Sequence, residues 1–182
     1  MRQLLLLRHA KSGWDDPRLS DHDRPLSQRG AAAAAAMGAA LRRLRLSPEL
    51  VLVSTARRTM ETLRALEPFG DSTLVDPLDS LYLASAERLL EILRATPETV
   101  RSVLVVGHNP GMQNLAMALV GPAAMARGGN GLQQLADRYP TGALAEFAIA
   151  GPWWGLDSGG GRLVRFMAPS DLPPDRAPEQ AV

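Results

Sequence analysis

Short, uninterrupted runs of apolar residues recur along the chain and predict strands that are buried on both faces. The runs are Gln3–Leu7, Leu50–Val53 and Val103–Val106. Continuous apolar stretches of this length are typical of the inner strands of a parallel sheet. Ser72–Val75 predicts a weaker strand, which Asp76-Pro77 closes.

The stretches between these runs have the spacing and composition of helices. Ser27 is expected to cap a long, alanine-rich helix that reaches about Leu46, because alanine is the best helix former. The other predicted helices are Ala56–Leu66, Ala86–Arg94 and Met112–Val120. The Gly- and Ala-rich stretch Gly121–Gly131 predicts a loop.

The last third of the chain has a different pattern. Leu144–Ala150 and Leu163–Met167 predict the two strands of a hairpin. Residues 168–182 are rich in proline and predict a flexible tail after a single domain of residues 1–167. Strands that alternate with helices and end in a hairpin predict an α/β fold. We expect a three-layer α/β/α sandwich whose sheet is mostly parallel and includes an antiparallel strand.

Composition narrows the class of protein. The 182 residues suit one domain with a proper core, and 20 Lys+Arg against 19 Asp+Glu leave no basic excess for nucleic-acid binding. The absence of cysteine excludes a disulfide scaffold, a thiolate zinc site and a cysteine nucleophile. The apolar start Leu4–Leu7 is too short for a signal peptide or a membrane span. We therefore expect a soluble, cytoplasmic protein without a membrane partner.

Basic and imidazole side chains follow three of the predicted strands. Arg8-His9 ends the first, Ser54 with Arg57-Arg58 follows the second, and His108 ends Val103–Val106. Ligands of open α/β sheets bind beyond the carboxyl ends of the strands, so these groups are expected to meet at one edge.

Each of these groups alone is more often structural than catalytic, but their combination favours phosphate chemistry. Arginine forks bind phosphoryl oxygens, one imidazole can attack phosphorus, and a second can donate to an equatorial oxygen. A zinc site is the weaker interpretation because Arg8 and Arg58 would oppose a cation. The remaining histidine, His22, lies in a charged stretch and is interpreted as a surface residue.

Four motifs in this order resemble the histidine phosphatase superfamily. Arg8-His9-Ala10 resembles its opening R-H-G, Arg24-Pro25-Leu26-Ser27-Gln28-Arg29-Gly30 its R-P-L-[ST]-x-x-G, and Ser54–Thr62 its S-x-x-x-R-[AT]-x-[QE]-T. Val105-Val106-Gly107-His108-Asn109-Pro110 matches the last motif. The resemblance spans residues 3 to 167. The short chain, with Lys11-Ser12-Gly13-Trp14-Asp15, is most similar to phosphohistidine phosphatases of the SixA type, which implies a phosphoglycerate mutase-like fold.

The resemblance also implies roles for individual residues. His9 would be the nucleophile that becomes phosphorylated, Arg8 and Arg58 would clamp the phosphoryl oxygens, and His108 would be the second histidine of the pocket. No metal and no cofactor are implied. The further substrate-binding candidates are Asp15, Arg57, Thr141 and Gly142.

Two departures from the family pattern bear on function. Ala10 replaces the usual glycine, which is tolerable unless the site needs a positive φ. No glutamate matches the general acid of the larger phosphomonoesterases, and Glu87 and Glu91 are interpreted as a solvated helix face. An alkoxide leaving group needs such an acid more than phosphoimidazole does, so phosphohistidine on proteins is the favoured substrate.

Two alternatives stay open at this point: a small-molecule phosphomonoesterase and an inactive phosphate-binding or interaction module. The expected partner is a phosphorylated protein or a small phosphorylated substrate, and the expected state is a monomer or weak dimer.

Overall fold

The computed structural model describes residues 1–173; residues 174–182 and the side chain of Asn130 lie outside the described part. A six-stranded sheet in the order β3-β2-β4-β1-β5-β6 forms its centre. The strands are β1 (Arg2–Arg8), β2 (Leu50–Ser54), β3 (Leu74–Leu78), β4 (Ser102–Gly107), β5 (Leu144–Ile149) and β6 (Gly161–Met167).

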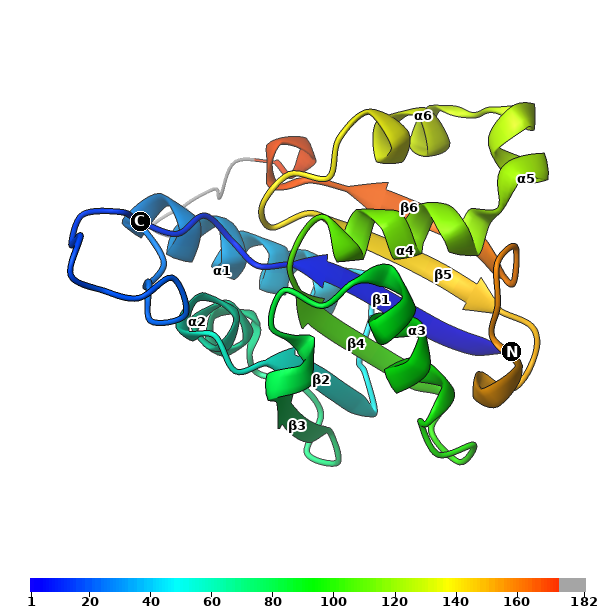
Figure 1. Ribbon diagram of the computed structural model, residues 1–182, viewed down its shortest axis with the longest axis horizontal. Coiled ribbons are helices and arrows are strands. Elements are labelled where there is room, and N and C mark those ends of the chain that lie inside the picture. Colours follow the sequence, from blue (N-terminus) through cyan, green and yellow to red (C-terminus); the bar gives the residue numbers. More distant parts are fainter. Residues whose placement is uncertain (174–182) are drawn as a thin grey trace, which may run out of the picture.

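Helices cover both faces of this sheet (Figure 1). One face is covered by α1 (Gln28–Arg43) and α2 (Arg57–Leu66), the other by α3 (Ala86–Arg94) and α4 (Gly111–Val120). The neighbouring pairs from β3 through β2 and β4 to β1 are parallel, whereas β5 is antiparallel to both β1 and β6. The predicted three-layer, mostly parallel architecture and the closing hairpin are therefore confirmed.

The central strand β1 shows why an apolar run makes a buried strand. Successive side chains point to opposite faces of a sheet. Leu4 and Leu6 belong to the core under α3 and α4, and Leu5 and Leu7 belong to the core under α1 and α2. All four side chains are fully buried, so β1 contributes equally to the two halves of the core.

Most predicted helices are confirmed, with small shifts at their ends. Ser27 caps α1 as predicted: its hydroxyl accepts a hydrogen bond of 3.1 Å from the amide of Gly30. The helix ends at Arg43 rather than near Leu46, because the chain reverses at Arg45, whose φ is 55°. The helix predicted for Ala86–Arg94 has the same bounds in the structure.

The prediction of a loop for Gly121–Gly131 is wrong. That stretch holds α5 (Pro122–Arg127), and α6 (Asn130–Asp137) begins before it ends. Proline at the first helical position needs no amide partner, so Pro122 starts α5 at no cost. The core holds α6 in place: Leu135 is fully buried.

Two further elements differ from the prediction in extent. Strand β3 runs through Asp76-Pro77 instead of stopping there, because it pairs only with β2 and an edge strand tolerates proline. Residues 168–182 were expected to be a tail, yet Ala168 is buried and Leu172 packs on the core beside α1. The remainder of the predicted tail, from residue 174, lies outside the described residues.

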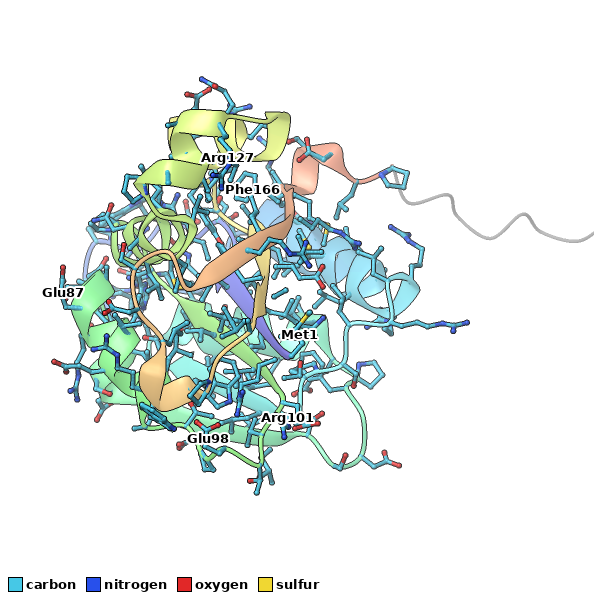
Figure 2. The ribbon with its side chains drawn as sticks, turned by 90° about the vertical axis from the view of Figure 1, so that its right-hand side faces the viewer. Met1, Glu87, Glu98, Arg101, Arg127 and Phe166 are labelled. Atoms are coloured by element: carbon cyan, nitrogen blue, oxygen red, sulfur yellow. The ribbon has the colours of Figure 1, made fainter. Side chains whose placement is uncertain are left out.

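Figure 2 shows the end of the molecule where β1 begins, opposite the carboxyl ends of β1 and β4. Arg127 of α5 and Phe166 of β6 lie near each other there and line a cavity of about 790 Å³. None of the four predicted catalytic residues lines this cavity. Across residues 1–173, no helix is long and apolar enough to cross a membrane.

Candidate active site

His9 and His108 meet at the ends of two neighbouring parallel strands. His9 follows β1, His108 follows β4, and the amide of His9 donates a 3.0 Å hydrogen bond to the carbonyl of Gly107. Their ring centroids lie 5.2 Å apart. The 11–25 loop, between β1 and α1, extends beyond these strand ends (Figure 1). The sequence prediction that the strand ends bring the two histidines together is confirmed.

The ring of His9 is held in one orientation by its own main chain. Nδ1 lies 2.7 Å from the carbonyl oxygen of Ala10, so Nδ1 carries the proton and donates it. The lone pair of the neutral ring is then on Nε2. Burial, aided by the charges of Arg58 and Arg8, lowers the pKa of His9 to about 4. The ring of His9 is therefore neutral at neutral pH, and its Nε2 carries a lone pair that could act as a nucleophile.

Ala10 fits the position where the family usually has glycine. The non-glycine residues of the described chain with positive φ are Arg45 and Leu83, so the backbone of Ala10 is one that any residue adopts. Its amide donates a 3.0 Å hydrogen bond to the Oγ1 of Thr62, and that hydroxyl donates to the carbonyl of Arg58. Thr62 thus joins the loop that follows His9 to α2, which carries Arg58.

His108 lies between a serine and an arginine, and these neighbours fix its tautomer. Nη2 of Arg58 lies 3.3 Å from Nδ1, which must accept because a guanidinium only donates. Nε2 lies 2.8 Å from the Oγ of Ser54 and therefore carries the proton. Burial, with the neighbouring His9, lowers the pKa of His108 to about 3. His108 is neutral in the free site.

Arg58 projects from the first turn of α2 and is held at both nitrogens of its fork. Its side chain is 4% exposed, and Nη2 lies 3.0 Å from the Oδ2 of Asp21. Nη1 donates to the main-chain carbonyl of Asp21. The exposed neighbour Arg57 instead pairs with Glu61 at 2.7 Å, which leaves Arg58 as the arginine of the pocket.

Arg8 is anchored from the opposite side of the sheet end. Its Nη1 donates a 2.7 Å hydrogen bond to the carbonyl of Tyr139. The Tyr139 hydroxyl donates to the carbonyl of Leu6 at 2.6 Å, and burial raises the pKa of this phenol. Nε of Arg8 is buried and has no hydrogen-bond partner within residues 1–173.

The helix-entry motif joins the 11–25 loop to the rest of the site. Gly30 in α1 touches the backbone of Lys11 so closely that any Cβ would collide with it. Glu61 of α2 accepts a 2.7 Å hydrogen bond from the amide of Leu26. The motif glycine and the motif glutamate therefore have structural roles, which seat the loop against α1 and α2.

Besides Arg57, the three weaker site predictions Asp15, Thr141 and Gly142 have different surroundings. Asp15 is exposed and takes part in no hydrogen bond or ion pair recorded for the described chain. The amide of Gly142 donates to the carbonyls of Arg8 and His9 at 3.1 and 3.0 Å, so it supports the strand end. The amide of Thr141 donates no recorded hydrogen bond within residues 1–173 and stays a candidate phosphate donor.

Sequence reasoning missed Asp21 and Tyr82 and misjudged His22. The Tyr82 ring lies 5.5 Å from that of His108, and its hydroxyl donates to Asp21 at 2.6 Å. His22 is half-buried against Tyr82, with ring centroids 4.9 Å apart, rather than a simple surface residue. The available signal was Asp21 itself, three residues before the Arg24-Pro25-Leu26 motif.

Two arginines and two neutral imidazoles therefore gather where β1 and β4 end. Arginine forks suit phosphoryl oxygens, and the buried setting strengthens their attraction for an anion. Within the described residues, no group of three or more histidine, aspartate or glutamate side chains is placed to hold a metal ion. The α/β fold and this set of side chains suit the binding of a phosphoryl group and the chemistry of phosphoryl transfer.

Comparison with known proteins gives the family. Residues 4–81 match the histidine phosphatase superfamily (branch 1). An uncharacterized chloroplastic protein of Arabidopsis thaliana is 35% identical, covering 92% of this chain and 78% of its own. An uncharacterized protein of Mycobacterium tuberculosis is 33% identical, covering 90% of this chain and 99% of its own. The chain belongs to the histidine phosphatase superfamily.

Solved structures confirm the phosphoglycerate mutase-like fold and the likeness to SixA. A candidate phosphohistidine phosphatase SixA from Nakamurella multipartitia superposes with a TM-score of 0.80 at 33% identity, covering 92% of this chain and 96% of the other. The protein histidine phosphatase SixA in complex with tungstate superposes with a TM-score of 0.72 at 26% identity, covering 93% and 98%.

Proposed function

We propose that this protein is a phosphohistidine phosphatase that acts through a phosphorylated His9 on phosphorylated proteins. The observation that carries the proposal is the state of His9: its Nδ1–H is bound to the carbonyl of Ala10, so Nε2 presents its lone pair. A module that only bound phosphate would need the arginines but no nucleophile in this state.

The first step transfers the phosphoryl group to the enzyme. Nε2 of His9 attacks phosphorus in line, a new N–P bond forms, and the bond to the leaving group breaks. Arg8 and Arg58 stabilise the charge on the equatorial oxygens. The departing imidazole nitrogen takes a proton from solvent. The proton on Nδ1 of His9 stays there and remains hydrogen-bonded to the carbonyl of Ala10.

The second step releases phosphate. Water attacks the phosphorus of phospho-His9, the N–P bond breaks, and the electron pair returns to Nε2. The proton lost by the water passes to solvent or to the phosphate. The hydrogen bond from Nδ1 to Ala10 keeps the ring in place, so the same nitrogen is ready for the next cycle.

The surroundings of Asp21 favour a nitrogen leaving group over an alkoxide. Hydrogen bonding to Tyr82 and the neighbouring arginines lower the pKa of Asp21 to about 2, so this carboxylate is ionised and is no general acid at neutral pH. An alkoxide depends on a positioned acid for about 10²–10⁴-fold of its rate. A protonated imidazole leaves without one, which supports phosphohistidine as the substrate.

A substrate panel tests the proposal. Wild-type protein is assayed on a phosphohistidine protein, free phosphohistidine and a set of phosphomonoesters, beside His9→Asn and the control Glu91→Gln, which changes an exposed side chain paired with Arg88. We expect the phosphohistidine protein to be hydrolysed fastest, His9→Asn to be inactive and Glu91→Gln to keep most of the activity. Faster turnover of phosphomonoesters would overturn the substrate class.

A further inference from the structure

Asp21 accepts hydrogen bonds from three different side chains at the edge of the pocket. Oδ1 lies 2.9 Å from Nη1 of Arg24, and Oδ2 lies 3.0 Å from Nη2 of Arg58 and 2.6 Å from the Tyr82 hydroxyl. The main-chain carbonyl of Asp21 accepts from Nη1 of Arg58. Arg58 is therefore held at both ends of its fork by one residue of the 11–25 loop.

The partners of Asp21 are themselves held in place. Arg24 donates to the Oγ of Ser12 at 2.7 Å and to the carbonyl of Gly13 at 3.1 Å, which ties it to the start of the loop. Tyr82 lies in a turn that packs on Gly111 at the start of α4, where the Ala84 carbonyl leaves no room for a Cβ. The carboxylate is thus fixed from two sides of the pocket.

Arg58 needs such a support to work on a phosphoryl group. A free arginine side chain samples many rotamers, and ordering it at the moment of reaction costs entropy. Donors that are already aimed at the developing charge avoid this cost. The contacts to Asp21 use one proton of each terminal nitrogen, and Nη2 lies 3.3 Å from Nδ1 of His108.

We propose that Asp21 is the positioning residue that holds the Arg58 guanidinium in its phosphoryl-binding orientation, and that Tyr82 and Arg24 keep the Asp21 carboxylate in place. This inference rests on the proposed function, because it assigns the pocket to a phosphoryl group. A stabilising surface ion pair is the alternative. Such a pair would add little to the free energy of unfolding, because the Asp21 side chain is 42% exposed and exposed ion pairs stabilise a fold only weakly.

Asp21 could act through its negative charge alone or by positioning Arg58, and these two explanations predict opposite results for Asp21→Asn. The variant keeps the size of the side chain but removes a negative charge next to the anion pocket. If Asp21 only lowered the local potential, its loss would tighten oxyanion binding and leave turnover intact. If Asp21 holds Arg58, the freed guanidinium misplaces its donors, and a displacement of about 1 Å costs on the order of 10²-fold in rate.

The test compares Asp21→Asn with Asp23→Asn, which removes the same charge two residues away. Asp23 contacts Ser20 and His22 and has no recorded contact with Arg58. Three measurements are made: kcat and KM on a phosphohistidine protein, tungstate affinity by calorimetry, and the NMR signals of the Arg58 guanidinium. Tyr82→Phe serves as a second variant that keeps the charge and removes one donor to Asp21.

For Asp21→Asn we expect a kcat at least about tenfold lower, weaker tungstate binding and Arg58 signals that show faster rotation of the guanidinium. Tyr82→Phe should lower kcat by about threefold, and Asp23→Asn should stay within about twofold of wild type. Unchanged kcat with equal or tighter tungstate binding in Asp21→Asn would overturn the inference.

The same measurements separate this inference from the proposed function. If the wild-type protein hydrolysed none of the substrates, the proposed function would fail. Tungstate affinity and the Arg58 signals need no turnover and would still decide the role of Asp21. Weakened tungstate binding with a freely rotating Arg58 would support that role, and unchanged values for both would reject it.

Discussion

The rings of His9 and His108 lie 5.2 Å apart between centroids, yet they carry their protons on different nitrogens. Nδ1 of His9 donates to a main-chain carbonyl, whereas Nδ1 of His108 accepts from Arg58. The first arrangement leaves the lone pair of His9 on Nε2, as the proposed nucleophilic role requires. The second means that His108 must gain a proton before its Nδ1 can donate to a phosphoryl oxygen.

The two buried histidines make stability depend on pH. Burial lowers the pKa of His9 to about 4 and that of His108 to about 3, from 6.5. Between these lowered pKa values and pH 6.5, the unfolded chain binds more protons than the folded chain. The contribution of the two neutral histidines to the free energy of unfolding is therefore fully present above pH 6.5 and is lost as pH falls. Each histidine contributes a slope of up to about 1.4 kcal/mol per pH unit.

Urea unfolding across that window measures this slope. The free energy of unfolding should fall steadily from pH 6.5 towards 4, and the double variant His9→Gln, His108→Gln should show a flatter profile. The lowered pKa of Asp21 makes stability depend on pH only below its ordinary pKa of 3.8, so Asp21 does not change the slope between pH 6.5 and 4. Equal slopes in wild type and double variant would show that the histidines are not buried neutral.

When an oxyanion binds, the protein should take up a proton from solution. His108 is neutral in the free site, and a bound dianion favours its protonated form. Tungstate affinity should therefore fall as pH rises above the pKa of His108 in the complex. Calorimetry in buffers with different ionisation enthalpies measures the uptake directly. We expect close to one proton at mildly acidic pH for wild type and none for His108→Gln. Equal uptake in the two proteins would contradict this role of His108.

Replacing Thr62 should lower the free energy of unfolding more than replacing a buried threonine whose hydroxyl has no hydrogen-bond partner. Thr62→Val removes the acceptor of the Ala10 amide and leaves that buried donor unpaired, at a cost of about 1–3 kcal/mol. Thr96 is the matched control: it is buried, and its Oγ1 has no hydrogen-bond partner within residues 1–173. Thr96→Val should leave the free energy of unfolding nearly unchanged.

Activity gives a second readout of the Thr62 substitution. Because the hydroxyl joins the His9 loop to the helix of Arg58, Thr62→Val should also lower kcat, whereas Thr96→Val should not. If the two variants lost the same stability and activity, the link through Thr62 would have no special role.

Local signals in the sequence predicted most of the fold. The apolar run of β1 and the Ser27 cap are complete within a few residues, so they could be predicted without the rest of the chain. The helices after Gly121 could not, because α5 and α6 are short and α6 is held by tertiary packing of residues such as Leu135. Their Gly-rich composition is that of a loop.

The same distinction applies to the site. Arg8 ends β1, and His9 and His108 directly follow β1 and β4, so the topology of a parallel sheet was enough to bring them together. Asp21 lies in an irregular loop, and its contacts with Arg58 and Tyr82 join positions 37 and 61 residues apart. No local pattern encodes such contacts, and only the folded chain shows that Asp21 supports the pocket.

Trapping the phosphoenzyme tests the central claim most directly. Wild-type protein is mixed with a phosphohistidine protein, quenched rapidly under basic conditions and mapped by mass spectrometry. We predict one acid-labile, base-stable phosphoryl group on His9, absent from His9→Asn and present in the control Glu91→Gln. Full turnover by His9→Asn, or a phosphoryl group trapped on a residue other than His9, would contradict it.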